Sequence, residues 1–293
     1  MNNVNKTIFT NELKLVFFIA LTSAIILFFG YVISEMFGFG LEGILISLIL
    51  AAGVNFFSYF FSKDIVLKSQ GAIRMREEEF PEYYNNVKMM CEKNNIIMPE
   101  LYYINTSSLN AFATGRNQKN AAVVVTSGLL KTLPMNEIMG VVGHELSHII
   151  HKDIMITSFI STLVGYITIL ASVLRNNAMY NSARNRNSNS TLPLLAITAT
   201  IIAPVVATLI RMAVSRSREY MADATGGKIC GNPQYLANAL YRISHGGCAM
   251  PTANEAVAPL YISNPLRGGF LSNLFSTHPN TEDRIKRLEN MQF

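Results

Sequence analysis

Charged residues are scarce in this chain. Asp, Glu, Lys and Arg make up 15% of its 293 residues, and hydrophobic residues make up 50%, whereas soluble domains carry about 25% charged residues. Four stretches hold no charge at all: residues 15–34, 43–62, 154–174 and 192–210. Each is close to the ~20 residues that a helix needs to cross the hydrocarbon core of a bilayer. This shortage predicts an integral membrane protein with about four transmembrane helices. Buried core helices are the alternative.

Other absences narrow the function classes. No basic face interleaved with aromatic residues occurs, so the net charge of +5 does not indicate nucleic-acid binding. Cys91, Cys230 and Cys248 are odd in number and form no Cys-x-x-Cys pair, which favours free thiols in a reducing compartment. No Gly-x-Ser-x-Gly motif is present, and the cysteines lie far from the histidines, which argues against a serine or cysteine hydrolase.

Lys and Arg are also missing from residues 35–42, which connect the first two apolar stretches. Lys6 and Lys14 precede the first stretch, and Lys63 follows the second. The positive-inside rule therefore places the N-terminus and everything from Lys63 onward in the cytoplasm. Residues 175–191 disagree, because they hold three arginines and no acid although two full crossings would place them outside. Either the first pair of helices sets the orientation or the second pair does not fully span.

The first apolar stretch is expected to be a retained membrane anchor and not a cleavable signal peptide. It is longer than the ~7–15 residues of a signal-peptide core, and no small-x-small cleavage site precedes Ser34. We therefore expect residues 1–62 to form an N-terminal transmembrane hairpin in the cytoplasmic membrane. Residues 63–293 would form a cytoplasmic domain, interrupted by a second membrane hairpin at about 154–210.

The polar part of the chain predicts a small sheet followed by helices. Alternating and β-branched residues indicate strands at 100–106, 108–115 and 121–130. Apolar spacing and capping residues indicate helices at 79–93, at 137–153 with Asn136 as N-cap, at 213–227 ending at its glycine pair, at 233–244, and at 281–291 with Thr281 as N-cap.

The sequence VVGHELSHII, residues 141–150, carries the main chemical signal. His144 and His148 are four residues apart, so on a helix both imidazoles lie on one face and can reach one metal ion. Glu145 lies beside them and can take a proton from a water molecule whose pKa zinc lowers to ~7. The alternative, two surface histidines on an amphipathic helix, competes poorly because the neighbouring residues are apolar.

A catalytic zinc site needs three protein ligands and one open position. The candidates for the third ligand are His151, His245, His278 and the acids after residue 210. His151 is a full turn too far along the helix, which makes it a flanking residue. Glu219 is the better choice, because Asp223 follows four residues later on the same helix face and can accept the outer N–H of a ligand histidine. The alternative is a solvated helix face.

Four motifs in order resemble the HtpX family of membrane zinc endopeptidases. They are NAFATG at residues 110–115, His-Glu-x-x-His at 144–148, Arg-Glu-x-x-Ala-Asp at 218–223 and STHPNTEDRIKRL at 276–288. The resemblance covers nearly the whole chain, and the related CAAX prenyl endopeptidases share the motifs but have more membrane spans. It implies one Zn²⁺ per chain, bound by His144, His148 and Glu219, with Glu145 as general base.

The resemblance also implies roles for three further residues. An asparagine at the position of Asn110 contacts the substrate backbone in the wider group, and residues matching His278 and Arg284 stabilise the reaction intermediate or hold the site together. From the residues alone, the alternatives are that Asn110 is a turn or strand-end polar residue and that His278 is a residue flanking Pro279. Arg284 can simply pair with Asp283 or with the helix of Glu219.

The expected fold is a membrane α-helical protein with a mostly α, α+β zincin-like catalytic domain, whose small sheet lies next to the histidine helix. The expected function is a zinc endopeptidase at the cytoplasmic membrane surface, and the resemblance implies that its substrates are membrane or membrane-associated proteins, including damaged or misassembled ones. A CAAX-type processing peptidase is the alternative, although four spans are few for its enclosing chamber. A zinc transporter or sensor would need ionisable residues inside the spans, and these four stretches offer none.

Overall fold

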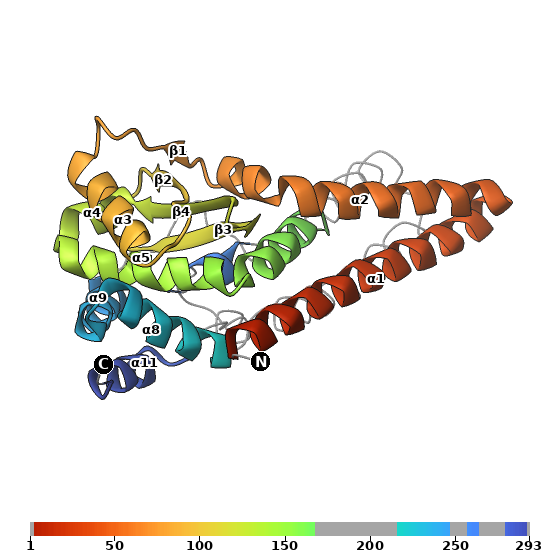
Figure 1. The fold of residues 1–293 in the computed structure, drawn as a ribbon. Helices are drawn as coiled ribbons and strands as arrows, with labels where there is room; N and C mark the ends of the chain where they lie inside the picture. Colours follow the sequence, from red (N-terminus) through yellow and green to blue (C-terminus); the bar gives the residue numbers. More distant parts are fainter. Residues whose placement is uncertain (1–2, 168–215, 247–256, 264–278, 292–293) are drawn as a thin grey trace.

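The computed structural model describes residues 3–167, 216–246, 257–263 and 279–291, which form a long helical hairpin and a mixed α/β body (Figure 1). The described elements are α1 (Asn3–Phe37), α2 (Gly40–Ser69), β1 (Ile73–Arg74), α3 (Pro81–Lys93), β2 (Glu100–Ile104), β3 (Ala111–Asn117), β4 (Asn120–Thr126), α4 (Ser127–Thr132), α5 (Met135–Ile150), an apolar helix Asp153–Ile167, α8 (Arg216–Cys230), α9 (Pro233–Gly246), the 3-10 turn Ala258–Leu260 and α11 (Thr281–Glu289).

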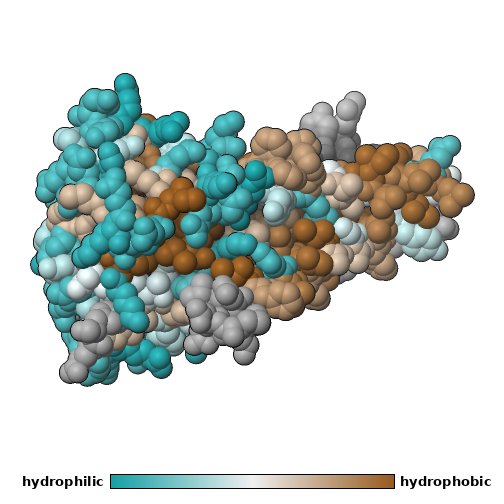
Figure 2. Space-filling model, viewed as in Figure 1, coloured by the Kyte–Doolittle hydropathy of each residue, from teal (hydrophilic) through white to brown (hydrophobic). Residues whose placement is uncertain are grey.

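The hairpin of α1 and α2 exposes apolar side chains and buries polar ones, which is the reverse of the distribution in a soluble protein. Figure 2 shows hydrophobic residues gathered over it, whereas hydrophilic residues dominate the body. The exposed side chains include Phe17, Phe28 and Ile49, while polar Ser47 and Asn55 are buried between the helices. A helix pair with this distribution is suited to apolar surroundings. There the apolar side chains face lipid, and the polar groups pair with each other across the helices. Both helices are long and apolar enough to cross a membrane, over Thr7–Phe28 and Gly40–Ser69.

The first two expected spans therefore correspond to real helices, but the second pair is only partly described. Helix Asp153–Ile167 is apolar and packs Phe159 and Leu163 against Phe18 of α1, at the base of the hairpin. The rest of the third expected span, residues 168–174, and all of the fourth, residues 192–210, lie outside the described residues. The expected domain boundary after residue 62 falls inside α2, which continues without a break to Ser69.

The sheet has four strands in the order β1-β2-β4-β3, with β2 and β4 parallel and the other pairs antiparallel. The β-branched run of β4 is buried on both faces, as expected for a central strand. Helices α3, α5 and α9 pack on one face, and the end of α2 and residues 257–261 pack on the other. Strand β3 therefore lies at one edge of the sheet, and it packs against α5.

Helix α5 is the element that the sheet positions. Its apolar side, which includes Val141, Val142 and Leu146, is fully buried in the main core. Pro134 directly precedes Met135, the first residue of α5. The backbone of Pro134 is extended, so the helix begins after it. His151 caps the C-terminal end, and Lys152 then takes a left-handed conformation with φ of 58° before the next helix begins at Asp153.

Several sequence predictions differ from the structure at element ends. The predicted third strand stops at Thr126, whose hydroxyl caps the short helix α4. The caps of α5 and α11 are Pro134 and Asn280 rather than Asn136 and Thr281. Helix α8 does not end at its glycine pair but continues to Cys230. At Gly226, the first glycine of the pair, the backbone of another helix lies against α8.

Helices α5 and α8 cross with their backbones in contact. A Cβ atom added at Gly226 would lie 2.7 Å from the backbone nitrogen of His144, and one added at Gly143 would lie 2.7 Å from the carbonyl oxygen of Gly226. Only glycine leaves room for this approach. The crossing brings α8 against the turn of α5 that carries the two motif histidines.

We expect Gly226→Ala to destabilise the protein. In an open helix this change stabilises by about 1 kcal/mol, but here the new methyl meets backbone atoms that cannot move aside, and overpacking of this kind costs ~1–3 kcal/mol. The measurement is the thermal unfolding temperature of the detergent-solubilised full chain. Gly53→Ala on α2 is the matched control, because nothing lies within 4 Å of its added Cβ. A Gly226→Ala protein as stable as the Gly53→Ala protein would contradict the proposed packing.

Candidate metal centre

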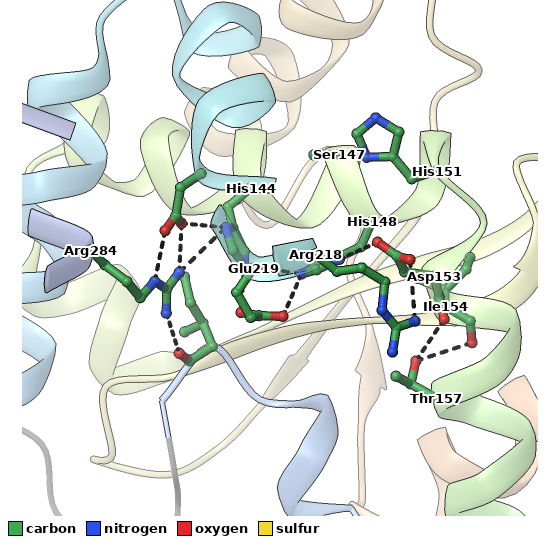
Figure 3. Close-up of polar contacts among 12 residues, drawn as sticks. His144, Ser147, His148, His151, Asp153, Ile154, Thr157, Arg218, Glu219 and Arg284 are labelled. Carbon is green, nitrogen blue, oxygen red and sulfur yellow. Dashed lines mark hydrogen bonds and ion pairs between the residues drawn. The ribbon is translucent and has the colours of Figure 1, made fainter. Parts of the chain in front are cut away.

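Helices α5 and α8 bring three potential metal ligands to one point. The Nε2 atoms of His144 and His148 lie 3.1 Å apart. The carboxylate of Glu219 faces both, with Oε2 3.7 Å from the His144 Nε2 and Oε1 3.5 Å from the His148 Nε2 (Figure 3). Among the described residues, these three form the group of His, Cys, Asp or Glu side chains that can hold a metal ion. His144 and Glu219 are buried, which excludes the solvated-surface alternatives for both helices.

This donor set fits zinc. Two imidazole nitrogens bound to one zinc at about 2.0–2.1 Å and a tetrahedral angle lie roughly 3.3 Å from each other, which agrees with the 3.1 Å between the two Nε2 atoms. Two imidazoles and one carboxylate are also the ligand set of one class of catalytic zinc site, with the fourth position left for water or substrate. All three ligand atoms lie within 4.8 Å of one another.

The outer nitrogen of His144 is held by a buried ion pair. Its Nδ1 lies 2.9 Å from Oδ1 of Asp223, which is one turn after Glu219 on α8. Arg284 of α11 grips the same carboxylate with two hydrogen bonds, from Nε at 2.9 Å and from Nη2 at 2.7 Å. Burial disfavours the charged carboxylate, but Arg284 and His144 outweigh it and hold the pKa of Asp223 well below its usual range. The carboxylate is therefore ionised and oriented to accept the His144 N–H.

His148 has a carboxylate partner that the sequence analysis missed. Its Nδ1 lies 3.0 Å from Oδ2 of Asp153, the first residue of the next helix. The other oxygen of Asp153 accepts hydrogen bonds from Asn11 Nδ2 at 2.8 Å and from Arg218 Nη1 at 3.3 Å. Only the closeness of Asp153 to His148 in the sequence could have indicated this contact. The contributions of Asn11 and Arg218 depend on how the helices dock.

Glu145 lies next to the ligands and is buried, with 1% of its surface exposed. Burial raises the pKa of Glu145 against the opposing influence of His144 and His148, and the backbone of Ala113 on β3 provides a hydrogen bond. A carboxylate whose pKa is raised above its usual value is a stronger base, which suits it to take up a proton. The contact with Ala113 also fixes Glu145 at the edge strand of the sheet.

The remaining predicted residues have different surroundings. Asn110 is buried beside β3, where its Nδ2 donates to the carbonyl of Ser263 at 2.9 Å and its Oδ1 accepts from the Ser263 N–H at 3.3 Å. His151 is buried away from the ligands, with its Nδ1 3.2 Å from the hydroxyl of Ser147, and His245 is exposed on α9. His278 lies outside the described residues.

The chain is similar to known proteins of one family. Residues 77–292 match the model of peptidase family M48. A protein named "Protease HtpX homolog" from Paraburkholderia phytofirmans is 45% identical over 264 residues, covering 89% of this chain and 91% of that one. The protein of the same name from Syntrophotalea carbinolica is 45% identical over 254 residues, covering 86% and 90%.

A solved structure shares the fold. The crystal structure of S. mikatae Ste24p is similar with a TM-score of 0.50 at 18% sequence identity, over 97% of this chain and 67% of that chain. The family match covers most of the chain, and the relatives match nearly all of it. This chain therefore belongs to peptidase family M48, and it is a membrane-bound metalloendopeptidase.

Proposed function

We propose that this protein is a zinc endopeptidase in which His144, His148 and Glu219 hold one Zn²⁺ and Glu145 is the general base. The observation that carries the proposal is the convergence of two imidazole nitrogens and one carboxylate, with a second buried carboxylate beside them. Zinc, when bound, supplies a Lewis acid that polarises the scissile carbonyl and lowers the pKa of the attacking water.

Glu145 performs the proton transfers in this proposal. Its carboxylate takes the proton of the attacking water and passes it to the amine that leaves when the peptide bond breaks. The raised pKa of Glu145 supports the first step, because a carboxylate with a higher pKa is a stronger base. The hydrogen bond from the Ala113 backbone keeps the carboxylate on the side of the site that faces β3.

Strand β3 is the proposed docking edge for the substrate. It is an edge strand that packs against α5, so an extended peptide added alongside it would run past Glu145. Asn110, the residue before this strand, holds both the N–H and the carbonyl of Ser263 through its side-chain amide. A side chain that pairs with the backbone N–H and C=O of one residue in this way has the chemistry to hold a residue of an extended substrate. The proposed contribution of His278 to the oxyanion rests on the family resemblance alone.

The proposed substrates are membrane or membrane-associated proteins, including damaged or misassembled ones. The base of the apolar hairpin lies directly at the site, since Asn11 of α1 contacts Asp153. Positive-inside charge favours the cytoplasmic side of the inner membrane for the body. The name shared by relatives at 45% identity favours this role over a CAAX-type processing peptidase.

Asp223 and Arg284 are proposed to hold His144 in place, and their pairing can be tested through stability. We expect Arg284→Met to cost about 3–5 kcal/mol of the free energy of unfolding, because it leaves the Asp223 carboxylate buried without its partner. The double change Asp223→Asn with Arg284→Met should recover part of this loss. Denaturant unfolding of the solubilised protein measures both.

The matched control is Arg287→Met on the same helix. Arg287 is exposed and stacks on the ring of Tyr220 at 3.8 Å, so its loss should cost about 1 kcal/mol or less. Equal stability of the Arg284→Met and Arg287→Met proteins would show that the ion pair does not stabilise the site.

The function itself is tested by Glu145→Gln. This protein should bind about one zinc per chain, as the wild type does, and should cleave casein at least 100-fold more slowly, because the proton acceptor is lost while the ligands remain. Glu137→Gln on the same helix is the control, since Glu137 pairs with Arg242 and not with the ligand group. Wild-type cleavage by a zinc-loaded Glu145→Gln protein would refute the role of Glu145.

A further inference from the structure

The N-terminal end of α1 reaches into the surroundings of the metal centre. Figure 1 shows this end of the helix beside the start of α8. Asn11, in the third turn of α1, is 1% exposed although it lies on a helix with many exposed apolar side chains. Its Nδ2 donates to Oδ1 of Asp153 at 2.8 Å and to the backbone carbonyl of His151 at 3.0 Å. Both partners are about 140 residues away in the sequence.

These two hydrogen bonds fix the link between α5 and the next helix. The link consists of His151 and Lys152, and Lys152 has the left-handed conformation that turns the chain between the helices. Asn11 holds the carbonyl at the start of this turn and the carboxylate at its end. The turn sets where Asp153 lies relative to α5. Asn11 therefore fixes the position of Asp153 both through the turn and through its own hydrogen bond to the carboxylate.

Asp153 transmits this position to a proposed zinc ligand. One carboxylate oxygen accepts from Asn11 and Arg218, which leaves the other oxygen aimed at Nδ1 of His148, 3.0 Å away. A carboxylate at Nδ1 keeps the imidazole proton on that nitrogen and leaves Nε2 free to bind metal. Arg218 compensates the charge of the Asp153 carboxylate. The neutral amide of Asn11 orients this carboxylate and connects it to the membrane helix α1.

We propose that Asn11 is a positioning residue of the metal centre, through which docking of the N-terminal membrane helix sets the orientation of His148 and the affinity for zinc. The inference rests on the proposed zinc site. It makes the first membrane helix part of the catalytic unit as well as an anchor, because removing the amide would release Asp153 while the three ligands remain in the chain.

A contact that only anchors α1 is provided by the next residue. Glu12 forms an ion pair with Lys152 at 2.6 Å, and half of the Glu12 side chain is exposed. This pair joins the same helix to the same link, but it does not contact Asp153 and is worth little because it is solvated. Glu12→Gln is therefore the matched control for loss of an α1 contact without loss of positioning.

The test compares full-length solubilised Asn11→Leu, Asn11→Ser and Glu12→Gln proteins with the wild type. Zinc affinity is measured by competition with a chromophoric chelator, and the visible spectrum of the cobalt-substituted protein reports the geometry of the ligands. We expect Asn11→Leu to weaken zinc binding by about tenfold or more, as for other partners of ligand histidines, and to change the cobalt spectrum. Glu12→Gln should leave both within twofold of the wild type.

Asn11→Ser keeps one donor on a small side chain, so it covers the case in which Asn11→Leu does not fold. We expect the Asn11→Ser protein to lose less zinc affinity than the Asn11→Leu protein and to have the unfolding temperature of the wild type. Wild-type affinity and an unchanged cobalt spectrum in a folded Asn11 variant would overturn the inference. His148→Ala separates this result from failure of the site itself, because wild-type zinc affinity in that variant would overturn the proposed ligands as well.

Discussion

The close crossing of α5 and α8 is the constraint on which the rest of the site depends. Two glycines, Gly143 and Gly226, let the helix backbones touch, and this contact places Glu219 opposite two histidines that lie 71 and 75 residues earlier in the chain. The apolar side of α5 is buried in the main core, so the position of α8 decides whether Glu219 lies near the two histidines. Helix Asp153–Ile167, which follows α5, packs against α1 at the base of the N-terminal hairpin.

Burial explains the second feature of the site, the carboxylate behind each histidine. A neutral imidazole inside a protein needs a partner for its outer N–H, and a buried carboxylate needs compensating charge. Asp223 serves His144 and is compensated by Arg284, and Asp153 serves His148 and is compensated by Arg218. Both histidines thereby present Nε2 to the same point. These contacts come from α1, α5, α8 and α11. The orientation of the two histidines therefore depends on the correct docking of all four helices.

The sequence was sufficient for those features that depend on local spacing. The four-residue interval of His144 and His148 requires only a helix, and the β-branched run of β4 requires only a strand. The glycine pair of α8 was misread as a helix end, because the same residue that ends a helix also permits close packing. Asp153, Arg218 and Asn11 were missed since their contacts depend on a left-handed turn at Lys152 and on the docking of α1, which no local pattern encodes.

The most direct test of the central claim is X-ray absorption at the zinc edge of the purified, zinc-loaded protein. The ligand set of His144, His148 and Glu219 predicts two imidazoles in the first coordination shell, with oxygen as the remaining ligand, at about 2.0–2.2 Å, and no sulfur. In a Glu219→Ala protein the oxygen contribution should fall or the metal should be lost. A third imidazole, or a sulfur ligand at about 2.3 Å, would contradict the proposed metal centre.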